Sequence, residues 1–155
     1  MSFVIARELR AFRAKSMAAV LFGSICFTAM ASAQTPAKIL IHVTHGPEAP
    51  TRVALAFLVA RTAAEQGHPV SLFLAGDAVN LLREDVLNSL TGVGTGKLRE
   101  HFDALVKAGA RFYVSGMSAK ARNLGPELIA NKPAEFAMPT VLLKLALDND
   151  RMFTY

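Results

Sequence analysis

Three side chains that could take part in chemistry stand close together in the segment "YVSGMSAKARNL". Ser115 and Ser118 offer hydroxyl groups and Arg122 offers a cation, around the small residue Gly116. A serine becomes a nucleophile only beside an activating base, and the nucleophile elbow G-x-S-x-G is not formed because Lys120 takes its last glycine position. Such a set suits an anion or polar ligand better than covalent catalysis. The alternative is that both hydroxyls simply cap the following helix.

Two further candidates follow other predicted strands. His45 ends the apolar run "KILIHVTH", and Asp77 comes directly after "PVSLFLAG". Ligands gather at the carboxyl ends of the strands in open α/β sheets, so both side chains are expected at the rim of the same pocket as the serine turn. Asp77 has a plainer alternative as a helix cap. An enzyme using this pocket would need a titratable group with a shifted pKa, and these two residues are its candidates.

Other patterns that resemble known sites fail on their spacing. His42 and His45 stand three positions apart on a strand and point to opposite faces, which argues against a shared metal ion. His42 is expected to be hydrogen-bonded inside the sheet, and His68 and His101 to be solvated. The run "GVGTGKL" lacks the first glycine and the final Ser or Thr of a P-loop. We therefore predict neither a metal nor a cofactor.

Residues 1–33 have the organisation of a secretory signal peptide. A basic head of three arginines and one lysine precedes the apolar run "MAAVLFGSICFTAM" and then "ASAQ". This order predicts cleavage after Ala33 and a periplasmic or secreted protein, with no membrane attachment after cleavage. The apolar run is short for a bilayer span; the alternative is an uncleaved N-terminal anchor.

Removal of this segment would change both charge and redox chemistry. Residues 1–33 hold four of the 17 basic and one of the 12 acidic residues, so residues 34–155 carry 13 and 11, a net charge of +2. The basic character of the whole chain is therefore no argument for nucleic acid binding. Cys26 is the one cysteine of the chain, so the mature protein would have no disulfide and no thiolate nucleophile.

The candidates are positioned by one α/β domain at 38–155, which follows a short linker at 34–37. Strands are expected at 38–45, 69–76, 110–116 and 151–155. Helices are expected at 52–66, 77–90, 97–109, 117–124 and 139–150, with a loop at 91–96 and a mostly irregular stretch at 125–137. A strand, a helix and a strand within about 40 residues form a βαβ unit and imply parallel pairing. The fold class is three-layer α/β/α with a mainly parallel sheet of four to five strands.

Two of the expected helices indicate where the core lies. The helix at 52–66 is rich in alanine and leucine, and Thr51 can cap it. Its small residues, such as Ala56, could pack on the sheet or could also line a subunit interface. The helix at 97–109 places a second apolar stripe on one face; its members are Leu98, Phe102, Leu105 and Val106.

The order of these segments resembles the DsrE/DsrF-like family. The resemblance rests on "KILIHVTHGPEAPTRVALAFLVARTAAEQGHPVSLFLAGDAV", on the run G-x-x-V-x-x-F-L-x-x-D-x-V at 67–79 within it, on "VSGMSAKARNL" and on the closing strand. It covers essentially all of 38–155. It implies a DsrE-like three-layer fold with a parallel sheet, and homo-oligomers or assemblies of related subunits such as trimers or hexamers.

The resemblance also implies what this chain should not do. Members that act in sulfur relay carry a persulfide on a cysteine just after the third strand. In several lines this cysteine lies seven residues before an arginine of the turn, and some have a second cysteine four residues before it. Counted back from Arg122, these positions are Ser115 and Ser118. A serine hydroxyl cannot hold a transferable sulfane sulfur as a thiolate can. We therefore expect an oligomeric accessory or binding module in periplasmic sulfur or redox metabolism; a ligand binder or an enzyme of unknown reaction is the alternative.

Overall fold

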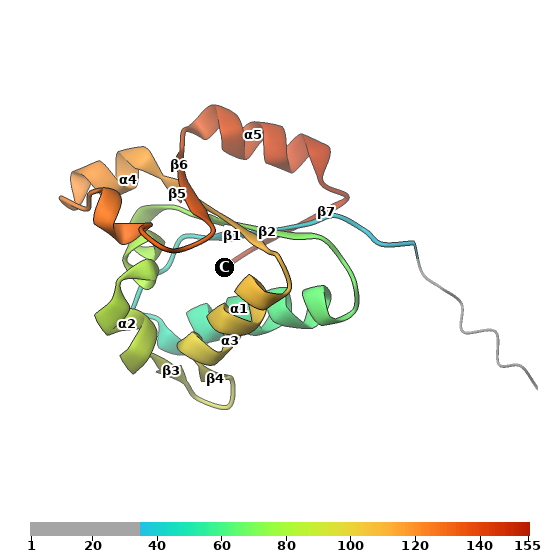
Figure 1. Ribbon diagram of the computed structural model, residues 1–155, viewed down its shortest axis with the longest axis horizontal. Coiled ribbons are helices and arrows are strands. Elements are labelled where there is room, and N and C mark those ends of the chain that lie inside the picture. Colours follow the sequence, from blue (N-terminus) through green and yellow to red (C-terminus); the bar gives the residue numbers. More distant parts are fainter. Residues whose placement is uncertain (1–34) are drawn as a thin grey trace, which may run out of the picture. The chain divides into compact units, whose positions relative to one another are not determined.

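A five-stranded sheet in which all neighbouring strands are parallel forms the centre of the domain. The computed structural model describes residues 35–155, which belong to a compact unit at Gln34–Tyr155; the predicted signal peptide lies outside them. The strand order is β6-β5-β2-β1-β7 (Figure 1). The strands are β1 (Ile39–Val43), β2 (Val70–Leu74), β5 (Arg111–Ser115), β6 (Ala134–Ala137) and β7 (Arg151–Thr154). The predicted fold class is confirmed.

Helices cover both faces of this sheet. Helices α1 and α3 lie on one face and α5 lies on the other (Figure 1). The α-helices are α1 (Pro50–Glu65), α2 (Glu84–Ser89), α3 (Leu98–Lys107), α4 (Gly116–Ala121) and α5 (Pro139–Asp148). The short elements are the 3-10 helices η1 (Gly76–Leu82) and η2 (Pro126–Leu128) and the hairpin strands β3 (Thr91–Gly92) and β4 (Gly96–Lys97). No helix within 35–155 has the length and hydropathy that crossing a membrane requires.

Three local expectations were wrong. The stretch at 125–137 was expected to be mostly irregular but contains the edge strand β6, which is the fifth strand of the sheet. The single helix expected at 77–90 is interrupted at Arg83, whose extended backbone (φ −67°, ψ 137°) separates η1 from α2. The loop at 91–96 closes a small antiparallel hairpin between β3 and β4.

The two faces of the sheet are packed very unequally. The face under α1 and α3 carries the main core, including the large fully buried side chains Phe57 and Phe112. On the opposite face the buried cluster consists of Leu40, Phe73 and Ala137 alone. Helix α5, which covers that second face, has no buried residue of its own. One side of the sheet is thus thinly covered in the described part of the chain.

Helix α1 uses its small residues for packing against the sheet. Ala56 is fully buried in the main core, as are the other apolar residues on this side of the helix. The expected cap was wrong, because the helix begins at Pro50 with Ala49 as its N-cap. The hydroxyl of Thr51 instead accepts a hydrogen bond of 3.1 Å from the backbone N–H of Val93. The alternative that Ala56 lines a subunit interface is therefore not supported.

His101 was expected to be solvated, but it lies on the buried face of helix α3. His101 is 5% exposed, and its Nε2 lies 2.6 Å from the carbonyl oxygen of Thr95. Positions 98, 101, 102 and 105 follow the i, i+3, i+4, i+7 spacing of one helical face. Val106, which was expected on that face, is 37% exposed.

An ion-pair network joins α2, α3 and the segment before β6. The ammonium group of Lys132 lies 3.0 Å from Glu84, and the Lys132 side chain is only 7% exposed. Glu84 also pairs with Arg99. The hydrogen bond from Lys132, followed by that from Arg99, holds the pKa of Glu84 below its usual value of 4.5 against the opposing effect of desolvation.

The substitution Glu84→Gln is expected to destabilise the domain by about 1 kcal/mol at pH 7, because it leaves the nearly buried ammonium group of Lys132 without its counter-charge. The loss is small because the Glu84 side chain is largely exposed and solvent screens its charge. The lowered carboxyl pKa stabilises the fold above pH 4.5, and this contribution is lost as the pH falls through the folded-state pKa. Urea unfolding across the acid range should therefore show a shallower loss of stability for Glu84→Gln than for the wild type. Parallel acid profiles would contradict it.

His42 lies on the thinly covered face, in T-shaped contact with Phe73 at 6.0 Å between ring centroids. Its Nε2 is buried and has no hydrogen-bond partner among the described residues, so the expectation of a hydrogen-bonded histidine was wrong for this atom. Desolvation by burial lowers the pKa of His42 from its usual value of 6.5. The folded state therefore disfavours protonation of the His42 imidazole.

Because the folded-state pKa of His42 is depressed, the domain is expected to lose stability as the pH falls below about 6.5, where the unfolded chain binds the proton more readily. The variant His42→Leu cannot titrate at this position and should lose less stability between neutral and mildly acidic pH. Urea unfolding of both proteins across this range measures the difference in their pH dependence. The other histidines are present in both proteins, so they do not account for this difference. An identical pH dependence would show that His42 does not titrate differently in the two states.

Candidate functional site

The candidate residues lie where β5 and β2 end. Strand β5 ends at Ser115 and α4 begins at Gly116. The Ser115 hydroxyl, which is 7% exposed, accepts a hydrogen bond of 3.3 Å from the backbone N–H of Ser118. Ser115 is therefore the N-cap of α4. The expectation that this hydroxyl caps the helix is confirmed.

Ser118 connects the helix to the neighbouring strand end instead of capping its own helix. Its hydroxyl accepts a hydrogen bond of 3.0 Å from the backbone N–H of Gly76, the first residue after the β2 turn at Ala75. Gly76 has a φ of 58°, a left-handed backbone that favours glycine. The Ser118 hydroxyl thus fixes a turn that carries the next candidate, Asp77.

Asp77 and Arg122 form an ion pair across 45 residues of chain. The Asp77 Oδ1 accepts bonds from Arg122 Nη2 at 2.6 Å and from Nε at 3.1 Å. Arg122 Nη1 also donates to the backbone carbonyl of Ser118 at 3.2 Å. Asp77 lies in the first turn of η1 but provides no side-chain cap, so the alternative of a helix cap was wrong. The cation expected to receive an anion already has a carboxylate partner.

His45 lies in the adjacent loop but points to a different partner. The two loops are joined by a hydrogen bond of 3.2 Å from the Asp77 N–H to the Thr44 carbonyl. The imidazole Nε2 lies 2.9 Å from Arg52 Nη1, and Nδ1 lies 3.4 Å from the Thr44 hydroxyl. Because guanidinium nitrogens only donate, Nε2 is the acceptor of this contact. Arg52 was not among the expected site residues.

These contacts restrict what chemistry the strand ends can perform. Among residues 35–155, no hydrogen bond connects His45 to Ser115 or Ser118, so neither hydroxyl has a base within reach in this conformation. The same residues contain no group of three His, Cys, Asp or Glu side chains that could hold a metal ion. The arrangement is one of neutral hydrogen bonds and a partly exposed ion pair, suited to holding the loops in place.

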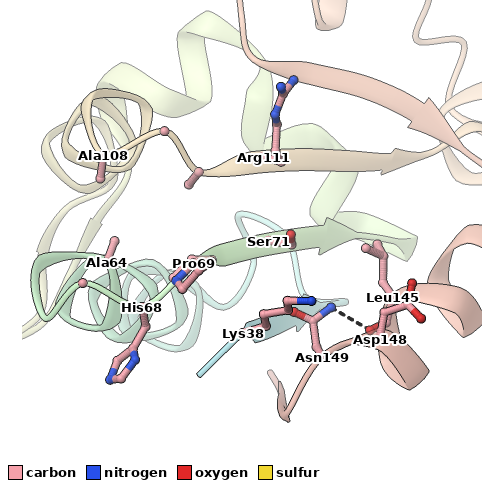
Figure 2. Close-up of a pocket in the computed structure, with 14 residues that line it drawn as sticks. Lys38, Ala64, His68, Pro69, Ser71, Ala108, Arg111, Leu145, Asp148 and Asn149 are labelled. Atoms are coloured by element: carbon pink, nitrogen blue, oxygen red, sulfur yellow. Dashed lines mark hydrogen bonds between the residues drawn. The ribbon is translucent and has the colours of Figure 1, made fainter. Parts of the chain in front are cut away.

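Five surface hollows in the described part of the chain are lined by residues other than these candidates. One of about 540 Å³ lies at the opposite, amino-terminal edge of the sheet. Figure 2 shows its lining, in which Arg111 and Ser71 come from neighbouring strands. The Asn149 amide donates to the Leu145 carbonyl at 2.7 Å on one side of it, the bond drawn as a dashed line.

The charges at this hollow have a structural explanation. The C-terminal ends of α1, α3 and α5 meet there, and helix C-termini carry partial negative charge. Lys38 and Arg111 are therefore placed where cations compensate helix ends. Asp148 adds a carboxylate to the same lining and pairs with Lys144. This mixture of charges does not make a dedicated anion site.

The family of the chain follows from its match to a known family profile. A profile of the DsrE/DsrF-like family matches residues 37–155. The chain belongs to the DsrE/DsrF-like family. Ser115 and Ser118 are the positions at which the resemblance drawn from the sequence implies cysteine in sulfur-relay members, and residues 35–155 of this DsrE/DsrF-like chain contain no cysteine.

Solved structures agree with this at the level of the fold. The ychN protein from E. coli superposes with a TM-score of 0.61 at 16% sequence identity, covering 77% of this chain and 99% of the other. A conserved protein of unknown function from Bacteroides thetaiotaomicron, BT1422, gives a TM-score of 0.52 at 11% identity, covering 76% and 94%. No protein of curated function matches the chain. At these identities the likeness shows a shared fold.

Proposed function

We propose that this DsrE/DsrF-like protein is an exported module that works by non-covalent assembly with other chains and is not itself a sulfur carrier. Its expected place is the periplasm, in sulfur or redox metabolism. The proposal combines the signal-peptide pattern of residues 1–33 with the family membership of residues 37–155. A second copy of this chain is the simplest partner, and a related subunit is the alternative.

One observation carries the proposal, which is the thin cover on the second face of the sheet. Parallel sheets in α/β proteins are normally buried on both faces. Here the second face holds a buried cluster of three residues and is covered by α5, which exposes Leu143 and Leu147. Leu143 and Leu147 lie one helical turn apart, so they form a neighbouring exposed apolar pair that a partner chain could cover. A partner chain on this side would cover the exposed side of α5 and exclude water from this thin layer.

The chemistry of the serine turn supports a non-covalent role. The Ser115 and Ser118 hydroxyls both accept backbone hydrogen bonds that fix the turn. Arg122, the cation of the turn, is neutralised by Asp77. With no thiolate at either position, a persulfide has no sulfur atom on which to form. The turn is best explained as a structural connection between strand ends.

Native mass spectrometry of the purified protein tests the proposal. We expect a mass of two or more chains with no covalently added sulfur after denaturation. A single chain at every concentration would overturn assembly, and added sulfur on a Cys26→Ser protein would overturn the non-covalent role. An extra non-covalent mass that disappears in Arg122→Ala would favour the ligand binder instead.

A further inference from the structure

The outer face of α5 is an apolar stripe with no partner among the described residues. Val141, Leu142, Leu145 and Ala146 turn inward and pack on the second face of the sheet. Leu143 and Leu147 point the other way and are 62% and 77% exposed. Their i,i+4 spacing places one above the other along the helix. Together these two leucines form what we call the outer stripe.

Two opposite charges flank this stripe on one side. Lys144 and Asp148 each follow a leucine of the outer stripe by one position, a rotation of about 100° around the helix. Both charges therefore lie on the same flank, with the cation nearer the N-terminus and the anion nearer the C-terminus. They pair with each other within the helix and are both largely exposed.

We propose that α5 packs against α5 of a second copy in antiparallel orientation about a two-fold axis. This inference rests on the proposed assembly and names its contact. In an antiparallel pair, Leu143 of one copy meets Leu147 of the other. The two-fold axis also brings the charged flanks to the same side, so Lys144 of each copy lies beside Asp148 of its partner. In a parallel pair the two-fold axis would place the two charged flanks on opposite sides of the contact, so no lysine–aspartate pair would form across it.

The small area of the α5–α5 contact indicates that the dimer is weak. A helix of ten residues is about 15 Å long, and two such helices bury less than the roughly 800 Å² per partner of a standard interface. The dimer should therefore dissociate on dilution. It would cover the outer stripe of both copies.

A charge-swap series tests the orientation, because each charge contact occurs twice in a two-fold dimer. Lys144→Asp and Asp148→Lys each create two like-charge contacts and are expected to weaken the dimer about tenfold. The double variant restores opposite charges and is expected to return to within about threefold of the wild type. Sedimentation velocity over a dilution series measures the dissociation constants. A double variant as weak as the single variants would overturn the antiparallel pairing.

A second pair of variants keeps this test separate from the proposed function. Leu147→Glu places a charge in the outer stripe and should give monomers, while Val93→Glu, at an 86% exposed position on the β3–β4 turn, should assemble as the wild type does. Circular dichroism confirms that both remain folded. An assembled wild type with an equally assembled Leu147→Glu would overturn the α5 contact alone. A wild type that is monomeric throughout would overturn the proposed assembly itself.

Discussion

Replacing Ala56 with glutamate is expected to unfold the domain. Ala56 is fully buried on the side of α1 that packs against the sheet. A carboxylate there would be buried without a partner, and the free energy of unfolding should fall by more than about 4 kcal/mol. This is a large part of the 5–15 kcal/mol that is typical of a domain (about 0.1 kcal/mol per residue). Urea or thermal unfolding followed by circular dichroism measures the loss.

The neighbouring position provides a matched control. Leu55 lies one residue earlier in the same helix and is 40% exposed. Leu55→Glu introduces the same charge into the same helix and should cost less than about 1 kcal/mol. An Ala56→Glu protein that stays folded and changes only its assembly would show that α1, not α5, forms the contact between chains.

The substitution Gly46→Ala is expected to destabilise the loop between β1 and α1 by about 2–4 kcal/mol. A Cβ on Gly46 would lie 2.6 Å from the carbonyl oxygen and 2.9 Å from the carbonyl carbon of Asp77. These are backbone atoms, so the β1 and β2 loops would have to move apart. The shift would also weaken the hydrogen bond between the Asp77 N–H and the Thr44 carbonyl. Chemical denaturation compares this variant with the wild type.

Gly116→Ala is the control for this steric effect. Its Cβ would meet only ordinary contacts, at 3.8 Å from the Ala137 carbonyl oxygen and 3.9 Å from Phe136. Neither Gly46 nor Gly116 has a positive φ, so backbone strain does not separate the two. Gly116→Ala should change stability by less than about 0.5 kcal/mol. Equal effects of the two substitutions would show that the close approach of the two loops is not what requires glycine at position 46.

Most of the sheet could be predicted from the sequence because β1, β2 and β5 are short, mostly apolar runs bounded by turns or glycines. Strand β6 escaped prediction because its middle residues, Glu135 and Phe136, are exposed and it follows an irregular stretch. An edge strand of this kind is defined by pairing with β5, which residue types alone do not reveal. Arg83 similarly interrupts a periodic segment through its backbone conformation, without proline or glycine to signal the break.

The positions of the candidate residues were easier to predict than their partners. The rule that strand carboxyl ends meet at one edge correctly placed Asp77 near Ser118 and Arg122. The Asp77–Arg122 pair joins residues 45 positions apart, and the His45–Arg52 contact joins a loop to a helix surface. Neither pairing has a spacing signature. The burial of His101 was missed for a different reason. A histidine was assigned to the polar side of α3, although position 101 has the spacing of the buried apolar face.

Hydrogen exchange of the α5 backbone amides, measured above and below the concentration at which the protein assembles, shows whether a second chain covers α5. Peptides covering Leu143 and Leu147 are expected to exchange more slowly in the assembled protein, because a second chain then covers the outer side of α5. Peptides from α1, which is already packed on the sheet, should exchange at the same rate in both states. Equal exchange of α5 at all concentrations would contradict the claim that another chain covers the outer side of α5.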